Sequence, residues 1–297
     1  MFSVKKITYV CYDTPKLSQQ TEYFSEVMGL TVTAKDSNTV YLGSVVDHHS
    51  VVLTQASQAL CSRVGFQVGA EEDLADYARH IESFGVKTAY KSDPAPGIAE
   101  QISFLDPKST IIEISKPQPV LDLRYKSKGV VPNKLGHVAF HVEDAAKMVA
   151  FYQDVLGFKV SDWLEDFFAF LRCGSDHHTV NFIGSGSVRH DHTAFELRDW
   201  SHIQNACEYL RKSGYKIIWG PGRHGIGHNL FTYHKNPDGL ITELFAELDT
   251  MSNEALGYFD PRPWHPDYPQ KPKRWEMKPG LVNLWRDEDP PEEMLKV

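Results

Sequence analysis

Apolar and polar residues along this chain alternate with two periods, and the order of these periods recurs. Residues 6–12 and 136–142 alternate with the period of two that is typical of a half-buried strand. Apolar residues spaced three and four apart then predict helices over residues 17–27 and 145–156, each followed by a glycine suited to a left-handed helix end. After each of these helices we expect a short hairpin, another strand, a second helix and a closing hairpin.

The two halves of the chain align with each other at an offset close to 129 residues. Five collinear matches fall within two residues of that offset; they include residues 22–30 with 150–158, residues 47–50 with 176–179, and Asp106 with Asn236. Collinear matches at one spacing are hard to obtain by chance, so we predict a duplicated domain.

The predicted elements define the fold class and the domain boundaries. Each copy of about 115 residues combines helices with a mostly antiparallel sheet, which is an α+β fold built from tandem βαβββ modules. We expect an N-terminal module over residues 1–116, a proline-containing linker over residues 116–132, and a C-terminal module over residues 133–248. Residues 249–297 repeat no other part of the chain and form a C-terminal extension.

Composition narrows the class of protein. The chain is 41% hydrophobic and 24% charged, and no apolar run approaches the roughly 18 residues of a membrane span. A net charge of -8 argues against sequence-independent binding of nucleic acid. The four cysteines form no CxxC pair, and the first residues lack the pattern of a signal peptide. We therefore expect a cytoplasmic protein with reduced thiols and with neither a membrane nor a nucleic-acid partner.

Three residues of the second copy could hold a metal ion together. His137 falls on the opening strand, His192 on the strand after the hairpin, and Glu243 on the closing strand. Two neutral imidazoles and one carboxylate make the facial triad that binds non-haem iron(II) and leaves coordination positions open. The residues are 55 and 51 positions apart, so only a shared sheet surface could bring them together.

A purely structural interpretation of these residues stays open on spacing alone. The first copy has Tyr9, Arg63 and Glu113 at the matching positions. The asymmetry favours a metal site confined to the second half, because tyrosine and arginine are poor substitutes for imidazole ligands. Glu113, however, lies in the matching strand of a half without the histidines, so Glu243 could also be a structural carboxylate.

The second half resembles the type I extradiol ring-cleaving dioxygenases of the vicinal oxygen chelate superfamily, which include 2,3-dihydroxybiphenyl 1,2-dioxygenase and catechol 2,3-dioxygenase. The resemblance covers both domains and is densest over residues 135–248. Its motifs are LGHV at 135–138, FYQDVLGF at 151–158, HHT at 177–179, RHDH at 189–192, GPGRH at 220–224, FTY at 231–233, and NPDG at 236–239 followed by Glu243.

This resemblance implies an iron(II) enzyme, with manganese(II) as an alternative, that opens a catechol-type ring with O2 to a muconic semialdehyde-type product in aromatic hydrocarbons catabolism. It implies His137, His192 and Glu243 as metal ligands. It also implies His178 as the acid/base near the dioxygen position, and His224 and Tyr233 as contacts of the substrate hydroxyls. It does not identify which catechol is the substrate, and it leads us to expect a homo-oligomer.

Several alternatives remain open at this stage. Relatives have two adjacent histidines at the second ligand, whereas this chain has His190-Asp-His192, so His190 is a competing ligand or outer-sphere residue. The Asp-His-His unit around His178 recurs at Asp47 in the first half, where it has no partner ligands, and so could be a hairpin preference. A glyoxalase-like metal isomerase or an aromatic-ligand binding protein of the same fold are the alternative functions.

The C-terminal extension contains three tryptophans and many prolines. A disordered segment is ordinarily poor in large aromatic residues. We therefore expect an ordered extension that covers the active site, with Tyr258 or His265 near the pocket, and a subunit contact as the alternative.

Overall fold

The computed structural model describes residues 2–120, 128–260 and 269–295. The strands of the first half are β1 (Lys6–Thr14), β2 (Thr31–Lys35), β3 (Thr39–Gly43), β4 (Val51–Gln55), β5 (Leu60–Gln67), β6 (Ala89–Ala95), β7 (Ile98–Leu105) and β8 (Ile111–Ser115). Its helices are α1 (Leu17–Glu22), a π-helix (Tyr23–Val27) and α2 (Leu74–Ser83).

The second half repeats this order and then continues into the extension. Its strands are β9 (Lys134–Val142), β10 (Lys159–Leu164), β11 (Phe168–Arg172), β12 (Val180–Gly184), β13 (Arg189–Glu196), β14 (Ile217–Arg223), β15 (Leu230–Lys235) and β16 (Ile241–Ala246), with helices α3 (Ala145–Leu156) and α4 (Trp200–Lys212). The extension adds a 3-10 turn (Glu254–Leu256), β17 (Lys273–Trp275) and α5 (Glu292–Leu295).

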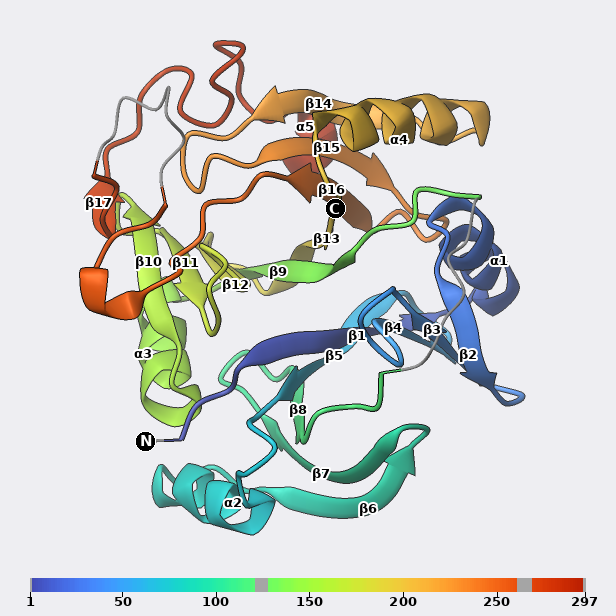
Figure 1. The fold of residues 1–297 in the computed structure, drawn as a ribbon, viewed down its shortest axis with the longest axis vertical. Coiled ribbons are helices and arrows are strands. Elements are labelled where there is room, and N and C mark those ends of the chain that lie inside the picture. Colours follow the sequence, from blue (N-terminus) through green and yellow to red (C-terminus); the bar gives the residue numbers. More distant parts are fainter. Residues whose placement is uncertain (1, 121–127, 261–268, 296–297) are drawn as a thin grey trace.

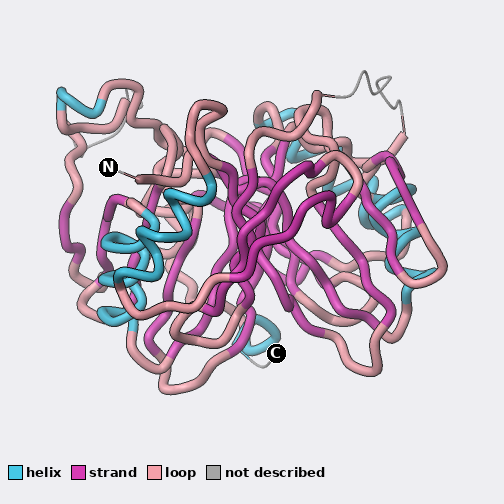
Figure 2. Tube along the Cα trace, turned by 90° about the horizontal axis from the view of Figure 1, so that it is seen from below, coloured by secondary structure: helices cyan, strands magenta, loops and turns pink. Residues whose placement is uncertain are grey.

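Each half is built on one curved mixed sheet, and the two halves lie against each other (Figure 1). The strand orders are β2-β3-β4-β1-β5-β8-β7-β6 and β14-β15-β16-β13-β9-β12-β11-β10-β17. The strands gather in the middle of the molecule and the helices flank them (Figure 2). The predicted α+β fold is confirmed. Each half contains the βαβββ motif twice, a finer repeat than the one we predicted.

The helix predictions were accurate in position but incomplete in type. Helix α3 begins at Asp144, whose side chain accepts the Lys147 N–H, and it ends at Gly157, whose φ of 72° is the expected left-handed conformation. The predicted helix over residues 17–27 is α-helical only as far as Glu22 and continues as a π-helix. Its wider turn is marked by the bond from the Met28 N–H to the Tyr23 carbonyl.

The halves are joined by two related buried contacts. The Tyr152 hydroxyl donates to Asp106 Oδ2 at 3.1 Å, and Asp106 also pairs with the buried ammonium of Lys108. At the corresponding place on the other side, the Tyr23 hydroxyl lies 2.7 Å from His234 Nε2. Both contacts join a helix of one half to the closing hairpin of the other, so the two modules share one apolar core.

The extension packs against the second half over its described residues. Strand β17 pairs in parallel with β10, and the Gly225 N–H donates to the Leu281 carbonyl at 2.8 Å. His265 and residues 121–127 of the predicted linker lie outside the described residues. Among those that are described, no helix combines the length and apolarity needed to cross a membrane.

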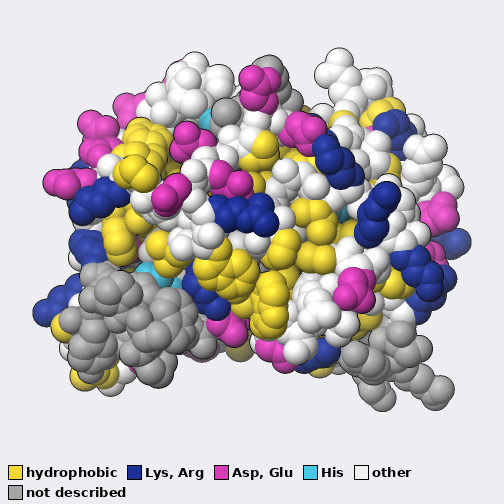
Figure 3. Space-filling model, turned by 90° about the horizontal axis from the view of Figure 1, so that it is seen from above, with side chains coloured by type: hydrophobic (Ala, Val, Ile, Leu, Met, Phe, Trp, Pro, Cys, Tyr) yellow, Lys and Arg dark blue, Asp and Glu magenta, His cyan; other side chains and the backbone are white. Residues whose placement is uncertain are grey.

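The face of the molecule drawn in Figure 3 carries acidic and basic side chains interspersed with apolar ones. Mixed charge of this kind agrees with the modest negative net charge of the chain. That the protein has no nucleic-acid partner stays a prediction.

Candidate metal centre

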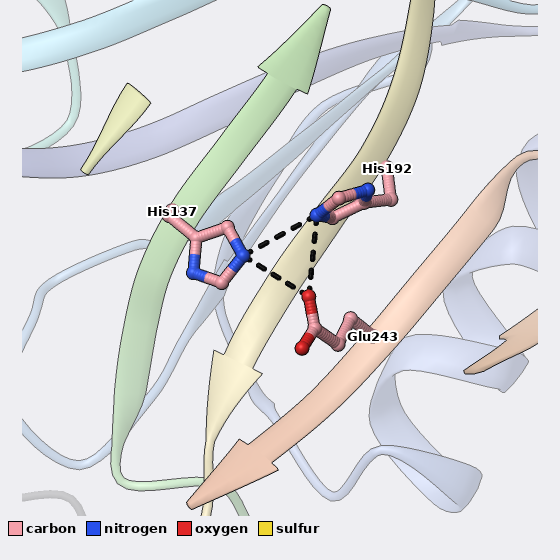
Figure 4. A group of neighbouring side chains, drawn as sticks. All are labelled: His137, His192 and Glu243. Atoms are coloured by element: carbon pink, nitrogen blue, oxygen red, sulfur yellow. Dashed lines mark hydrogen bonds and ion pairs between the residues drawn. The ribbon is translucent and has the colours of Figure 1, made fainter. Parts of the chain in front are cut away.

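His137, His192 and Glu243 project from three neighbouring strands of the second sheet (Figure 4). In the strand register, His137 of β9 and Glu243 of β16 both lie opposite Ala194 of the central strand β13. His192 precedes Ala194 by two residues and so shares its face of the strand. The small alanine side chain leaves the space between the three ligands open.

The donor atoms of these residues are arranged as one face of an octahedron. His137 Nε2 lies 3.0 Å from Glu243 Oε2, His192 Nε2 lies 3.2 Å from the same oxygen, and the two nitrogens are 3.3 Å apart. Metal–ligand bonds of about 2.1 Å at right angles place neighbouring donor atoms about 3.0 Å apart. The three side chains therefore fit a six-coordinate divalent metal and leave three positions for other ligands.

Electrostatics also favour a cation at this place. All three side chains are buried, and burial of an ionised carboxylate is costly unless a positive charge compensates it. Burial by itself would raise the pKa of Glu243, but the imidazoles of His137 and His192 hold it well below its usual value. A carboxylate that stays ionised in an apolar site can act as a metal ligand.

Asp191 supports the second ligand from behind. Its Oδ1 lies 2.5 Å from His192 Nδ1, and its Oδ2 lies 2.8 Å from His141 Nε2. Burial opposes the protonation of His192, but the hydrogen bonds to Asp191 and Glu243 raise its pKa to about 9 in the metal-free site. The sequence analysis missed this role of Asp191, although its position beside His192 was the available signal.

His190 is directed away from the metal site. A register shift between His190 and His192, in the pairing of β13 with β9, breaks the alternation that would otherwise put both rings on one face. His190 Nε2 bonds the Thr193 hydroxyl at 2.9 Å, and its ring packs against Tyr12 and Phe140. The prediction that His190 could compete as a ligand is therefore not supported.

Asn229 is a further residue that the sequence analysis did not identify. Its Nδ2 donates to Glu243 Oε1 at 3.0 Å, which occupies the carboxylate oxygen that faces away from the imidazoles. The bond orients the carboxylate so that Oε2 points to the other ligands. No motif in the sequence distinguished this asparagine.

The three residues expected to handle protons and substrate also reach the site. The His178 ring lies 4.3 Å from the His137 ring, and burial lowers its pKa well below the usual value. His224 Nε2 lies 3.1 Å from the Tyr233 hydroxyl, and His224 Nδ1 lies 2.6 Å from the Val282 carbonyl of the extension. Since a carbonyl only accepts, Nδ1 carries the proton and Nε2 accepts the hydrogen bond of the Tyr233 hydroxyl.

A cavity of about 270 Å³ opens above the triad. Its described walls are mostly apolar or aromatic: Leu164, Phe167, Phe168, Phe170, Ile183, Trp219, Ile226, Met277, Leu281, Val282, Pro290 and Met294. The polar lining residues gather around the triad, apart from Asp289 of the extension. Six of the lining residues belong to the extension, whereas Tyr258 is not among them and His265 lies outside the described residues.

The first half holds a counterpart of the triad in which a protein cation stands where a metal would bind. Arg63 lies 3.3 Å from Glu113 Oε1, and the Tyr9 hydroxyl donates to Glu113 Oε2 at 3.0 Å. Gln101 completes the group by donating to the Tyr9 oxygen at 2.8 Å. The carboxylate charge is thus already balanced. In the described part of the chain, the only cluster able to hold a metal is the one in the second half.

Comparisons with known proteins agree with this arrangement. Residues 134–244 match the model of the Glyoxalase/Bleomycin resistance protein/Dioxygenase superfamily. The chain is 28% identical over 200 residues to metapyrocatechase 2 of Cupriavidus necator, a match that covers 60% of this chain and 62% of that protein. It is 25% identical to the manganese-dependent 2,3-dihydroxybiphenyl 1,2-dioxygenase of Geobacillus genomosp. 3, over 93% of this chain and 96% of that protein.

A solved structure is similar over nearly the whole length. The Mn(II)-bound glyoxalase from Novosphingobium aromaticivorans superposes with a TM-score of 0.85 and 27% identity, and the match covers 99% of this chain and 94% of that one. The matched residues 134–244 contain all three candidate ligands as well as His178, His224 and Tyr233. The second half of the chain therefore resembles the Glyoxalase/Bleomycin resistance protein/Dioxygenase superfamily, and the relatives with which the chain shares the most sequence include extradiol dioxygenases.

Proposed function

We propose that this protein is an extradiol dioxygenase that opens the ring of a catechol-type substrate with O2. The metal is iron(II) or manganese(II), held by His137, His192 and Glu243. The observation that carries the proposal is an open three-residue metal site at the base of an aromatic-lined cavity, with proton-carrying side chains around it. When bound, the metal supplies the charge that acidifies the substrate hydroxyls and the open positions at which the diol and dioxygen meet.

Three side chains of the protein accept, donate or transfer the protons of the diol hydroxyls. Burial lowers the pKa of His224 to about 4, so its Nε2 is an acceptor that can hold a substrate hydroxyl. Burial, together with the nearby Glu243 carboxylate, raises the pKa of Tyr233, which keeps its hydroxyl a hydrogen-bond donor. His178, also neutral in the resting site, takes a proton as the diol binds and returns it when the O–O bond breaks.

The cavity favours a catechol with an apolar, uncharged substituent. Its described lining residues include neither lysine nor arginine, and Asp191 and Asp289 add negative charge beside the aromatic walls. A substrate carboxylate would lose its hydration there without gaining an ionic partner. An alkyl or aryl group would instead bury its surface against Phe168, Trp219 and Met294.

The extension supports a covering role. Met277, Leu281, Val282, Asp289, Pro290 and Met294 form part of the cavity wall. Enclosing the site excludes water from the reacting oxygen species and strengthens the electrostatic interactions within it. A homo-oligomeric state and a cytoplasmic location remain predictions.

A glyoxalase-like isomerase is the second candidate, because a Mn(II)-bound glyoxalase is a close structural match. Isomerases of that kind are expected to hold the metal with a fourth protein ligand. In this chain, Arg63 and Tyr9 occupy the related position in the first half, and the second-half cluster has three members. Three ligands together with the acid/base group His178 favour the dioxygenase.

A ring-cleavage assay tests the proposal. Protein reconstituted anaerobically with Fe(II) or Mn(II) is mixed with 3-alkylcatechols, 2,3-dihydroxybiphenyl and a carboxylate-bearing catechol, and oxygen uptake and ring-opened product are followed. We expect stoichiometric oxygen uptake with the apolar diols and at least a tenfold lower kcat/KM with the carboxylate. Absence of oxygen uptake with every diol, together with turnover of a glutathione or other thiol hemithioacetal, would establish the isomerase instead.

A further inference from the structure

A chain of three buried residues leads from strand β10 to the candidate metal centre. His178 Nδ1 lies 3.0 Å from His177 Nδ1, and His177 Nε2 lies 2.9 Å from Asp162 Oδ2. All three side chains are buried; Asp162 and His177 have no exposed surface at all. The ordered sequence of contacts is therefore carboxylate, imidazole, imidazole, cavity.

Hydrogen-bond chemistry determines the tautomer of each ring along this chain. A carboxylate only accepts, so His177 Nε2 carries a proton and donates it to Asp162. With His177 neutral, its Nδ1 is an acceptor, and His178 Nδ1 must be the donor in the bond between the rings. The remaining nitrogen of His178, Nε2, is then unprotonated and presents a lone pair.

The first half offers an internal comparison. His48 Nδ1 and His49 Nδ1 are 3.1 Å apart, so the same pair of rings recurs in the Asp-His-His unit of that half. The residue 129 positions before Asp162 is Thr33, whose hydroxyl bonds the Tyr41 carbonyl. The paired histidines are thus common to both halves, whereas the buried carboxylate behind them belongs to the half with the metal site.

The extension fixes the outer end of the chain. The Lys273 N–H of β17 donates to Asp162 Oδ1 at 2.9 Å, and the Phe259 ring packs 4.7 Å from the His177 ring. The Asp249 carbonyl accepts the His177 backbone N–H at 2.9 Å. Asp162 thus has both oxygens occupied by donors, which holds its carboxylate in one orientation.

We propose that Asp162 and His177 are positioning residues that hold His178 in the tautomer whose Nε2 accepts a proton from the substrate. The inference rests on the proposed function for the identity of that substrate, but the tautomer itself is a property of the protein alone. In this arrangement the extension has a second role besides forming the cavity wall, because it orients the carboxylate on which the tautomer depends.

The substitution Asp162→Asn tests this arrangement with little change in shape. The asparagine oxygen can still accept the Lys273 N–H, which leaves the amide NH2 facing His177 Nε2. A donor then replaces an acceptor, so both imidazoles must change to the other neutral tautomer. His178 Nε2 then carries the proton. A carboxylate-to-amide change behind a catalytic histidine in a serine protease lowers kcat by about 10⁴-fold through the same tautomer effect.

The decisive readout is the histidine tautomer, measured by long-range 1H–15N spectra of metal-free, 15N-histidine-labelled protein. We expect His178 to be protonated at Nδ1 in the wild type and at Nε2 in Asp162→Asn. The metal-loaded variant should keep its metal and its KM while kcat falls by at least about 100-fold. His48→Gln, in the half without the carboxylate, is the matched control and should leave kcat unchanged.

Wild-type spectra alone can overturn the proposal, even if the variant does not fold. The proposed positioning role of Asp162 and His177 would be contradicted by a His178 protonated at Nε2, or by a His177 protonated on both nitrogens. Unchanged kcat in a folded Asp162→Asn variant would contradict it as well. Failure of wild-type protein to cleave any catechol would refute the proposed function. The tautomer measurement would still decide whether Asp162 and His177 position His178.

Discussion

At the scale of single residues, the structure distinguishes the candidate metal ligands from the residues that orient them by hydrogen bonds. His137, His192 and Glu243 were identifiable from the sequence because the duplicated half provides an internal reference, in which tyrosine and arginine stand at the positions of the two histidines. Asp191 was missed although it adjoins His192, and Asn229 was missed because its contact with Glu243 depends on the fold. The register shift between His190 and His192, which no local pattern records, explains why the sequence could not exclude His190.

The proposed acid/base residue can be tested without disturbing the ligands. His178→Gln should still bind one metal and a catechol, because the residue lies beside the ligand cluster and is not part of it. We expect kcat to fall by about 100-fold or more, the usual contribution of a positioned proton carrier. Steady-state kinetics and metal analysis of the same preparation give both values. Full activity would return the Asp-His-His unit to a hairpin role.

The support that Asp191 gives to His192 should be visible in metal binding. The Asp191 carboxylate orients the His192 ring and increases the basicity of its Nε2. Because Asp191→Asn removes this carboxylate, metal affinity should fall by about 10- to 100-fold. Competition with a chelator of known affinity measures this directly. Asp176→Asn, a change in a partly exposed ion pair with Lys134, is the control and should leave the metal affinity as in the wild type.

At the scale of elements, the fold joins helices of one half to hairpins of the other. The sequence predicted the order of elements well, because period and glycine placement are local signals. It did not reveal that each half is itself a pair of βαβββ units, since those quarter-length copies differ in sequence. The π-helical continuation of α1 was also missed, because the spacing of its buried residues Tyr23, Phe24 and Val27 is compatible with an α-helix as well.

The contact between the π-helix and the hairpin of β15 and β16 should make stability depend on pH. Burial lowers the pKa of His234 to about 3, so between about pH 6.5 and pH 3 the unfolded chain binds a proton that the folded chain does not. The contribution of His234 to the free energy of unfolding is therefore fully present above pH 6.5 and is lost as the pH falls. At pH 4.5 this residue alone should lower the free energy of unfolding by about 2 to 3 kcal/mol.

Urea unfolding at pH 7.0 and pH 4.5 checks this expectation. His234→Gln retains a group that can bond the Tyr23 hydroxyl but does not titrate. The difference in unfolding free energy between the two pH values should be smaller in the variant than in the wild type. Equal differences in the two proteins would mean that His234 does not contribute.

The last residues of the extension should matter for catalysis more than for assembly. Ending the chain after Asp287 removes Asp289, Pro290 and Met294 from the cavity wall while keeping β17 and the Leu281 contact. We expect kcat/KM for an apolar catechol to fall at least tenfold, with unchanged metal content and unchanged mass by light scattering. A truncated chain that keeps its activity but changes its oligomeric state would assign the segment to a subunit contact.

At the scale of the whole molecule, duplication has produced one site equipped for a metal and one that balances its own charge. In the second half, two imidazoles and a carboxylate leave a cation-sized space, whereas in the first half Arg63 and Tyr9 satisfy the corresponding Glu113. The sequence showed this asymmetry, but only the fold shows that Arg63 contacts the carboxylate. Six described residues of the extension line the cavity of the second half.

The number of metal ions per chain tests this account most directly. Protein loaded anaerobically with Fe(II), freed of excess metal and analysed by plasma emission spectrometry should contain one iron per chain. His137→Ala, His192→Ala and Glu243→Gln should each bring this value close to zero, whereas Tyr9→Phe and Arg63→Lys should leave it at one. Two metal ions per wild-type chain, or one that persists in His192→Ala, would contradict a single site in the second half.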